Sequence, residues 1–282
     1  MTAKPLSGGR LRSALFAPAV RVDFIRKLPA RGADVIILDC EDAVPGDAEA
    51  KARARETVRD EMPGLLDAGC IVLARINAPN TPWFADDVAA LADCGVAALV
   101  LPKVDVVADL DALRTVPGIG AGALVIGLES APGVADARAL LAHPLVAGGY
   151  FGAEDFVADM GGVRTPGNLE VLFARSQIAL AGRLAGVPVF DQVVTEFGDG
   201  DRFEREAREA RALGFAGKLC IHPAQVEIAN RAFAPSTEER ERARRLLEAY
   251  DAGLARGVAS VDFDGQMVDE ALAVQARRLL DK

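Results

Sequence analysis

The feature that most constrains the fold of this chain is a repeated alternation of short apolar runs with longer helix-like segments. The apolar runs cover residues 14–18, 35–39, 71–75, 97–101, 123–128, 146–151, 187–189 and 218–221. They recur at a spacing of roughly 25–30 residues, as expected for repeated strand–helix units. A short apolar run between turn residues is typical of a strand buried on both faces. We therefore predict a (β/α)₈ TIM barrel over residues 1–233.

A doubly wound open sheet is the alternative fold. No G-x-G-x-x-G motif follows the first apolar run, and no Walker A loop occurs anywhere in the sequence. The alternation ends near Phe233. Beyond it, residues 236–256 predict a charged helix, 259–263 a short strand and 269–281 a last helix. We expect residues 234–282 to form a C-terminal helical extension that serves as a lid or an oligomer arm.

Composition and charge exclude several classes of function. With a net charge of −9, the 282-residue chain repels nucleic acid and anionic membranes. No apolar run approaches the ~20 residues of a membrane span, and residues 1–13 lack the apolar middle of a signal peptide. The four cysteines form no C-x-x-C pair, which favours reduced thiols. We expect a cytoplasmic protein that binds neither nucleic acid nor membrane.

Two neighbouring apolar runs end in acidic residues. Glu129 follows residues 123–128, and Glu154 and Asp155 follow residues 146–151. In a parallel α/β fold, ligands bind at the carboxyl ends of the strands. Two carboxylates on adjacent strands suit one hard divalent cation, and we predict Mg²⁺ at Glu129 and Asp155. The alternative is that these acids only cap the helices that follow.

Other charged residues also follow the predicted strands. They are Asp39, Glu41, Asp42, Arg75, Lys103, Lys218 and His222. A barrel gathers such residues at one end. A metal ion together with Arg75 suits a 2-oxo acid, because the metal polarises the keto oxygen and the guanidinium binds the carboxylate. The alternatives are that Lys103 and Lys218 only form ion pairs with neighbouring acids and that His222 is structural.

Several motifs resemble those of the CitE-like family. The strings are LFAPA (15–19), LDCEDAVP (38–45), RIN (75–77), VLPK (100–103), GLESAPGV (127–134), YFGAEDF (150–156), GKLCIHPAQV (217–226) and GQMVDE (265–270). This family includes the citrate lyase β subunit and the malyl-CoA and citramalyl-CoA lyases, within the HpcH/HpaI aldolase superfamily. The resemblance implies a TIM barrel, often trimeric or hexameric, with Mg²⁺ at the end where the strands open.

The resemblance also implies roles for individual residues. Glu129 and Asp155 match the two Mg²⁺ ligands, and Glu129 also borders the substrate. Arg75 matches the arginine that binds the 2-oxo or hydroxy acid. Asp39, Glu41 and Asp42 match an acidic loop near the metal, with Asp39 and Glu41 as catalytic candidates and Lys103 as a substrate-binding one.

Two further matches lie outside these strand ends. Arg12 matches a position near the CoA or acyl part of the substrate. Asp269 matches an acid/base residue that reaches a neighbouring subunit. One departure is the run APAVRVD (17–23), where relatives commonly have PGNRPD. The missing Gly-Asn changes the expected shape of the acyl pocket.

The resemblance implies a Mg²⁺-dependent carbon–carbon lyase. Its substrate would be a 3-hydroxyacyl thioester, carried on CoA or on an acyl carrier protein. The products would be an acetyl thioester and a 2-oxo acid, namely glyoxylate, pyruvate or oxaloacetate. Thioester hydrolysis is a further activity found among relatives. The alternatives are an aldolase that acts on free hydroxy-oxo acids and a non-catalytic binding subunit. We expect a homotrimer or hexamer.

Overall fold

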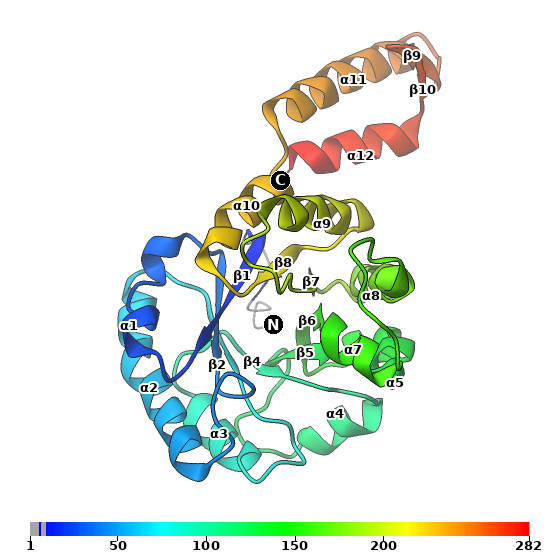
Figure 1. The fold of residues 1–282 in the computed structure, drawn as a ribbon. Helices are drawn as coiled ribbons and strands as arrows, with labels where there is room; N and C mark the ends of the chain where they lie inside the picture. Colours follow the sequence, from blue (N-terminus) through cyan, green and yellow to red (C-terminus); the bar gives the residue numbers. More distant parts are fainter. Residues whose placement is uncertain (1–5, 7–9, 282) are drawn as a thin grey trace. The chain divides into compact units, whose positions relative to one another are not determined.

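A computed structural model describes residue 6 and residues 10–281 of the chain. Eight parallel strands close into a barrel in the order of the sequence, since β1 pairs with both β2 and β8. The strands are β1 (Ser13–Pro18), β2 (Val35–Asp39), β3 (Val72–Arg75), β4 (Ala98–Leu101), β5 (Leu124–Leu128), β6 (Val146–Phe151), β7 (Val189–Asp191) and β8 (Gly217–Cys220). Helices surround this barrel (Figure 1). The predicted TIM barrel is therefore confirmed.

The helices that follow the strands carry the chain back across the outside of the barrel. They are α1 (Val22–Ile25), α2 (Ala48–Asp67), α3 (Phe84–Leu91), α4 (Val107–Leu113), α5 (Ala131–Ala135), α6 (Ala137–Leu141), α7 (Ala153–Asp159), α8 (Leu172–Ala185), α9 (Gly200–Leu213) and α10 (Pro223–Phe233). Two 3₁₀ turns add η1 (Pro29–Arg31) and η2 (Leu169–Val171). The segment near 21–31 is thus interrupted, because Pro29 has no N–H with which to continue the helix.

The seventh strand begins two residues later than the sequence predicts. It spans Val189–Asp191 rather than 187–189, because Pro188 has no N–H to donate to a strand ladder. Phe190 and Asp191 pair with Gly217 and Lys218 of β8. This register makes a buried carboxylate, Asp191, the last residue of the strand.

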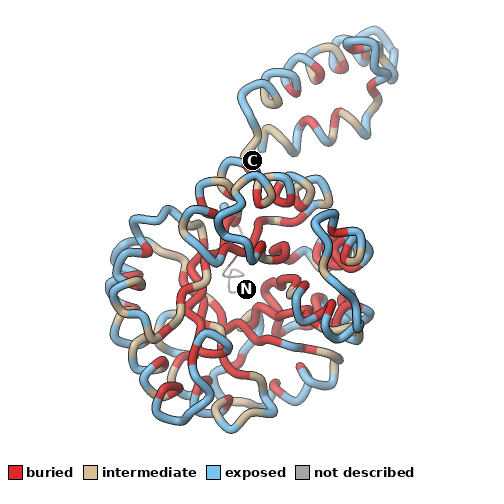
Figure 2. Tube along the Cα trace, in the orientation of Figure 1, coloured by how far each residue is buried: buried red, intermediate tan, exposed pale blue. Residues whose placement is uncertain are grey.

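The apolar core of the barrel has two layers. One fills the space between the strands and the surrounding helices, and the other fills the barrel interior. The inner layer includes Val35 and Ile37 from β2, Leu73 from β3 and Val125 from β5. Figure 2 shows buried positions along the strands and exposed positions on the outer faces of the helices. Because side chains alternate along a strand, this layer identifies which residues point inward.

The chain divides into two compact units, Met1–Phe233 and Ala234–Lys282. The second unit contains α11 (Thr237–Ala255), β9 (Val261–Phe263), β10 (Gln266–Val268) and α12 (Glu270–Leu280). The two strands form an antiparallel hairpin around Asp264 and Gly265, both of which have positive φ. The sequence predicts only the first of these strands. The unit has a small core of its own, which includes Leu246, Tyr250 and Val268.

Among the residues that the structure describes, no helix is both long enough and apolar enough to cross a bilayer.

Candidate active site

The candidate site lies at the end of the barrel where the carboxyl ends of the strands open, which we call the mouth. Asp39 and Arg75 end β2 and β3 and are direct partners in the strand register. Asp39 continues the inward series Val35 and Ile37, and Arg75 follows the inward Leu73. Alternation along the strands therefore directs both side chains toward the barrel axis.

Arg75 is held by carboxylates from the β2–α2 loop. Its Nε and Nη2 donate to the two oxygens of Asp39 at 2.8 and 2.5 Å. Its Nη1 lies 3.0 Å from Oε2 of Glu41. The guanidinium carbon also lies over the ring of Phe16, 4.9 Å from its centroid. Burial lowers the pKa of Arg75, but the bonds to Asp39 outweigh it, so the pKa lies above the ordinary value and the group is always charged.

Asp39 serves as an anchor for this loop. Besides the two bonds from Arg75, its oxygens accept the backbone N–H groups of Glu41 at 2.9 Å and Ala43 at 3.3 Å. Each oxygen thus accepts two hydrogen bonds, which satisfies the carboxylate. Asp39 therefore orients Arg75 and the loop, and has no free oxygen for a proton of the substrate.

Glu41 bridges two cations at the mouth. Its Oε1 accepts from Nζ of Lys103 at 3.1 Å, and its Oε2 faces Arg75. Oε2 is buried and has no hydrogen bond of good geometry with any part of the chain that the structure describes. Burial raises the pKa of Glu41, and the charge of Arg75 opposes that rise. Asp42, which is more exposed, lies 3.9 Å from both cations.

Glu129 occupies a tight space at the end of β5. The side chain is buried, with 4% of the residue exposed. Two glycines make room for it. A Cβ at Gly152 would lie 2.6 Å from Cγ of Glu129, and a Cβ at Gly127 would lie 2.6 Å from its Oε1. The close approach therefore requires glycine at both positions.

The surroundings of Glu129 disfavour its negative charge. Burial raises the pKa of its carboxyl to about 7, and the charges of Glu41 and Asp155 act in the same direction. The hydroxyl of Tyr150 and the charge of Arg75 partly oppose the rise. Tyr150 Oη is buried next to Glu129, although the two do not meet the geometry of a hydrogen bond. A bound cation would relieve this excess of negative charge.

The contacts of Glu129 and Asp155 test whether they cap helices. The N-cap of α5 is Ser130, whose hydroxyl accepts from Gly133 N at 3.1 Å. The N-cap of α7 is Gly152, with no side-chain cap. Neither carboxylate caps its helix, so the capping alternative is wrong for both. Asp155 is exposed in the first turn of α7, and its charge acts on Glu129 and Lys103.

The donor set fits a hard cation that keeps several waters. Within the described residues there is no group of three or more His, Cys, Asp or Glu side chains arranged to hold a metal. Two carboxylates with waters in the remaining positions is, however, a common arrangement for Mg²⁺. The buried Glu129 carboxyl with its raised pKa and the exposed Asp155 offer such a pair. Glu41 supplies further negative charge beside them.

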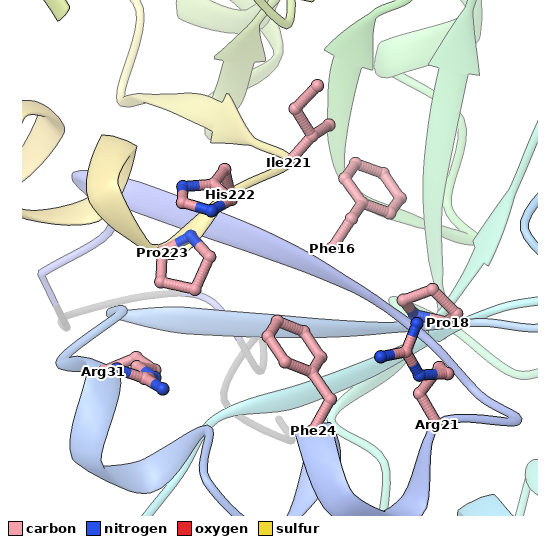
Figure 3. Close-up of a pocket in the computed structure, with 8 residues that line it drawn as sticks. All are labelled: Phe16, Pro18, Arg21, Phe24, Arg31, Ile221, His222 and Pro223. Atoms are coloured by element: carbon pink, nitrogen blue, oxygen red, sulfur yellow. The ribbon is translucent and has the colours of Figure 1, made fainter. Parts of the chain in front are cut away.

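Two adjoining cavities open beside these residues. The smaller, of about 250 Å³, is lined by Phe16, Pro18, Asp39, Ala43, Arg75, Val193 and Ile221. The larger, of about 390 Å³, is lined by Phe16, Pro18, Arg21, Phe24, Arg31, Ile221, His222 and Pro223 (Figure 3). Phe16, Pro18 and Ile221 border both. The Arg75 site is thus continuous with a larger space that holds two arginines.

His222 and the two arginines give the larger cavity its character. The imidazole stacks on Phe197 at 5.1 Å, and its Nδ1 accepts from Ala224 N. Among the described residues, no carboxylate lies within 4.0 Å of the guanidinium of Arg21 or of Arg31. The cavity therefore combines aromatic walls with two cations that are free to bind anions.

Three residues that the sequence singles out lie elsewhere. Arg12 precedes β1, at the opposite end of the barrel, and is paired with Asp34 at 2.8 Å. The length of β1, about 20 Å at 3.3 Å per residue, separates it from the mouth. The substrate-binding role expected for Arg12 is therefore not supported. Lys218 is fully buried and bonded to Asp191 at 2.8 Å, as the ion-pair alternative states.

Asp269 belongs to the second unit. It is the N-cap of α12, and its Oδ1 accepts from Ala271 N at 3.0 Å and Leu272 N at 3.3 Å. The capping contact expected for it is therefore present. An acid/base role in a neighbouring subunit stays a prediction.

The sequence reading misses Phe16 and Tyr150. Phe16 lies under Arg75 and borders both cavities. Tyr150 is the strand partner of Gly127 and lies beside Glu129. One signal could have revealed Tyr150. A glycine near the end of one predicted strand pairs with a large side chain near the end of the next, and the glycine leaves room for that side chain.

Comparisons with known proteins agree with this geometry. The sequence profile of the family described as HpcH/HpaI aldolase/citrate lyase matches residues 12–223. A profile described as a C–C bond lyase of the TIM-barrel fold matches residues 173–280. A citrate lyase subunit beta-like protein of Deinococcus radiodurans is 47% identical over 96% of both chains. A (3S)-malyl-CoA thioesterase of Cereibacter sphaeroides is 34% identical over 96% of this chain and 94% of its own.

A solved structure extends the likeness to three dimensions. Protein CitE of Mycobacterium tuberculosis, in complex with magnesium, acetoacetate and coenzyme A, superposes with a TM-score of 0.83. The two sequences are 32% identical, and the match covers 98% of each chain. With its barrel, its mouth residues and these relatives, the chain belongs to the HpcH/HpaI aldolase/citrate lyase family and is a carbon–carbon lyase.

Proposed function

We propose that this protein is a Mg²⁺-dependent lyase that cleaves or forms a 3-hydroxyacyl-CoA. Its products would be acetyl-CoA and a 2-oxo acid such as glyoxylate, pyruvate or oxaloacetate. The observation that carries the proposal is the arrangement of Arg75 and Glu129 at the mouth. Arg75 is oriented by Asp39 and Glu41, and Glu129 is a buried carboxyl with a pKa of about 7. Solved relatives contain magnesium with oxaloacetate or with pyruvate.

Arg75 suits the 2-oxo acid end of the substrate. An arginine has five N–H groups, and the contacts to Asp39 and Glu41 occupy at most three. At least one N–H on each terminal nitrogen remains for a carboxylate or a keto oxygen. Since its carboxylate partners fix the guanidinium, binding costs little side-chain entropy.

Cleavage requires a proton acceptor for the substrate hydroxyl, and Glu41 fits this role. Its Oε2 is buried, faces Arg75 at 3.0 Å and, within the described residues, lacks a hydrogen bond. In the proposed step, the hydroxyl proton passes to Glu41 and the bond between the carbinol carbon and the thioester α-carbon breaks. The bonding electrons pass to the thioester enolate, while Arg75 stabilises the new keto group. Mg²⁺ at Glu129 and Asp155 would act as a Lewis acid on the same oxygens.

The larger cavity favours CoA as the carrier of the acyl group. Arg21 and Arg31 offer cations for phosphate groups, and the aromatic walls suit a long apolar and amide chain. A free hydroxy-oxo acid would leave this cavity and both arginines unused. The cavity therefore argues against the aldolase alternative, and the intact charged mouth argues against a non-catalytic subunit.

An assay over several thioesters tests the proposal. The purified protein is incubated with malyl-CoA, citramalyl-CoA or methylmalyl-CoA, with Mg²⁺ or with EDTA. The 2-oxo acid and the released acyl-CoA are measured, which is acetyl-CoA from the first two substrates and propionyl-CoA from methylmalyl-CoA. We expect Mg²⁺-dependent release of one 2-oxo acid per acyl-CoA released. The proposal would be contradicted if no thioester released a 2-oxo acid and if no 3-hydroxyacyl-CoA formed from acetyl-CoA and a 2-oxo acid.

A second candidate activity is hydrolysis of the thioester. The observation that favours it is the likeness to the malyl-CoA thioesterases, at 33–34% identity over 96% of this chain. The assay above separates the two activities, because hydrolysis releases free CoA thiol and cleavage alone does not.

We also propose that the protein acts as a trimer or hexamer in the cytoplasm. In that assembly, the unit Ala234–Lys282 of one copy would bring Asp269 to the site of the next, as the acid that protonates the enolate carbon. The four cysteines are free, which fits a reducing compartment.

A further inference from the structure

A buried lysine behind the candidate site has no part in the chemistry proposed above. Lys51 lies in the first turns of α2, and only 3% of the residue is exposed. Among the described residues, no carboxylate lies within 4.0 Å of its ammonium group. A buried ammonium without an acidic partner is rare, since burial of a charge is costly. Its contacts therefore call for an explanation.

The ammonium of Lys51 is satisfied by the backbone of the acidic loop. Nζ donates to the carbonyl oxygens of Cys40 at 2.8 Å and Glu41 at 2.7 Å. It also lies 5.2 Å from the ring centroid of Trp83, just before α3. These are three directions of contact for the three N–H groups of an ammonium. Lys51 thus joins two consecutive peptide groups of the loop to a rigid helix.

The two carbonyl groups that Lys51 binds lie on either side of the Cα atom of Glu41, so they control where the Glu41 side chain lies. Glu41 carries the oxygen that we propose as the proton acceptor, and its carbonyl is one of the two that Lys51 binds. The Cys40 carbonyl also accepts from Asn77 Nδ2 at 3.1 Å, and the Glu41 carbonyl from Val44 N at 3.1 Å. On the other side, Asp39 accepts the Glu41 N–H. The peptide groups on both sides of Glu41 are therefore fixed by side chains.

We propose that Lys51 is a positioning residue, which holds the β2–α2 loop so that the Glu41 carboxylate faces Arg75 and Lys103. The assignment of Glu41 as proton acceptor rests on the proposed function, whereas the restraint on the loop does not. Without the ammonium, the Cys40 carbonyl keeps Asn77 and the Glu41 carbonyl keeps Val44. The loop should then persist with greater freedom rather than unfold.

The test uses three variants of the full-length protein. Lys51→Met keeps the length and apolar character of the side chain and removes the charged donors. Lys51→Arg restores a cation that can donate to two carbonyls. Arg53→Met is the matched control, because Arg53 lies on the same helix, is exposed and, among the described residues, forms an ion pair only with Glu49. If Lys51→Met does not accumulate as folded protein, Lys51→Gln, which keeps amide donors, takes its place.

The first measurement is hydrogen exchange of the metal-free protein. The reporters are the amides of Glu41, Ala43 and Val44, which are hydrogen-bonded within the loop. In Lys51→Met we expect them to exchange about tenfold faster or more, with β3 amides unchanged, because local opening becomes easier. Lys51→Arg should recover most of the protection, and Arg53→Met should match the native protein.

The second measurement separates kcat from KM with the thioester that the native protein cleaves best. We expect kcat of Lys51→Met to fall about 10–100-fold, by analogy with the range for residues that orient the ligands of a catalytic metal. KM should stay within about threefold, since the cavity with Arg21 and Arg31 does not include the loop. Lys51→Arg should recover part of kcat.

Three results would overturn the proposal. They are unchanged loop exchange in Lys51→Met, faster exchange with an unchanged kcat, and a lowered kcat that Arg53→Met reproduces. If the native protein shows no lyase activity at all, the proposed function fails. The exchange experiment then still decides whether Lys51 holds the loop.

Discussion

At the scale of single residues, the site is defined by how two charged groups are compensated. Arg75 is partly buried and paired with Asp39 and Glu41, so its charge is stable and its direction fixed. Glu129 is buried and faces further negative charge, so its ionised form is disfavoured. One group is ready to bind an anion and the other to bind a cation, which is what a 2-oxo acid with Mg²⁺ requires.

The first prediction concerns Arg75→Lys. Lysine keeps the charge but loses the planar fork, so it cannot contact Asp39 through two bonds and also present two N–H groups to the substrate. We expect kcat/KM to fall by an amount equivalent to about 2–4 kcal/mol. Steady-state kinetics checks this. Near-normal kinetics would assign Arg75 to a structural ion pair.

The second prediction concerns pH and the stability of the metal-free protein. The pKa of Glu129 is about 7 in the folded state, against the 4.5 of an ordinary glutamate. The folded state therefore holds this proton more tightly than the unfolded chain. Ionisation destabilises the fold progressively between pH 4.5 and 7, by an amount on the order of 3 kcal/mol above pH 7. Glu129→Gln removes this penalty.

Thermal unfolding in EDTA at pH 5 and pH 8 checks the effect. We expect Glu129→Gln to have a higher Tm than the native protein at pH 8 and a similar Tm at pH 5. Glu154→Gln is the control, because Glu154 is exposed and pairs with Arg164. A lower Tm of Glu129→Gln at both pH values would argue against an uncompensated carboxylate.

At the scale of elements, the strand ends and the loops after them place the site. Much of this was predictable, because Asp39, Arg75 and Glu129 continue the inward positions of their strands. The inward position of Tyr150 was not predictable from alternation, since the run Gly148-Gly149-Tyr150 does not alternate between apolar and polar residues. The burial of Lys51 was not predictable either, because Lys51 lies in a charged helix whose pattern is that of an exposed surface.

The prediction at this scale concerns Gly152→Ala, at the start of α7. The added methyl group would lie 2.6 Å from Cγ of Glu129, so that side chain has to move. We expect Mg²⁺ affinity to fall at least tenfold, with the barrel still folded. Gly167→Ala is the control, because a Cβ at Gly167 meets no described atom within 4 Å and the residue has no positive φ. Gly161→Ala would be a poor control, because a side chain is strained at its φ of +66°. Calorimetric titration of Mg²⁺ into both variants checks this, and equal affinities would contradict it.

At the scale of the whole molecule, the chain has two units with separate cores. The barrel and its charged mouth follow from patterns in the sequence, whereas the position of Arg12 does not. Arg12 directly precedes β1, and the direction of that strand places Arg12 at the end of the barrel opposite the mouth. Arg21, the N-cap residue of α1, lies at the mouth instead, where no carboxylate of the described residues pairs with its guanidinium.

The prediction for the second unit concerns Asp269, which caps α12 and is proposed to act on a neighbouring copy. Asp269→Ala and Glu129→Gln oligomers should each be nearly inactive. When the two variants are co-expressed, mixed oligomers should regain part of the activity. Some sites then combine both metal ligands, Glu129 and Asp155, with an intact Asp269 from the neighbouring copy. No recovery in demonstrably mixed oligomers would contradict the model of action between subunits. A fully active Asp269→Ala with a slightly lower Tm would leave only the cap.

The central claim is that Glu129 and Asp155 hold Mg²⁺ beside Arg75. Calorimetric titration of Mg²⁺ into the metal-free native protein and into Glu129→Gln, Asp155→Asn and Glu154→Gln tests it most directly. A carboxylate-to-amide change keeps the shape and removes the charge on which Mg²⁺ binding depends. We predict that binding is lost in Glu129→Gln and Asp155→Asn and retained in Glu154→Gln. Undiminished Mg²⁺ affinity in the first two variants would contradict the proposed site.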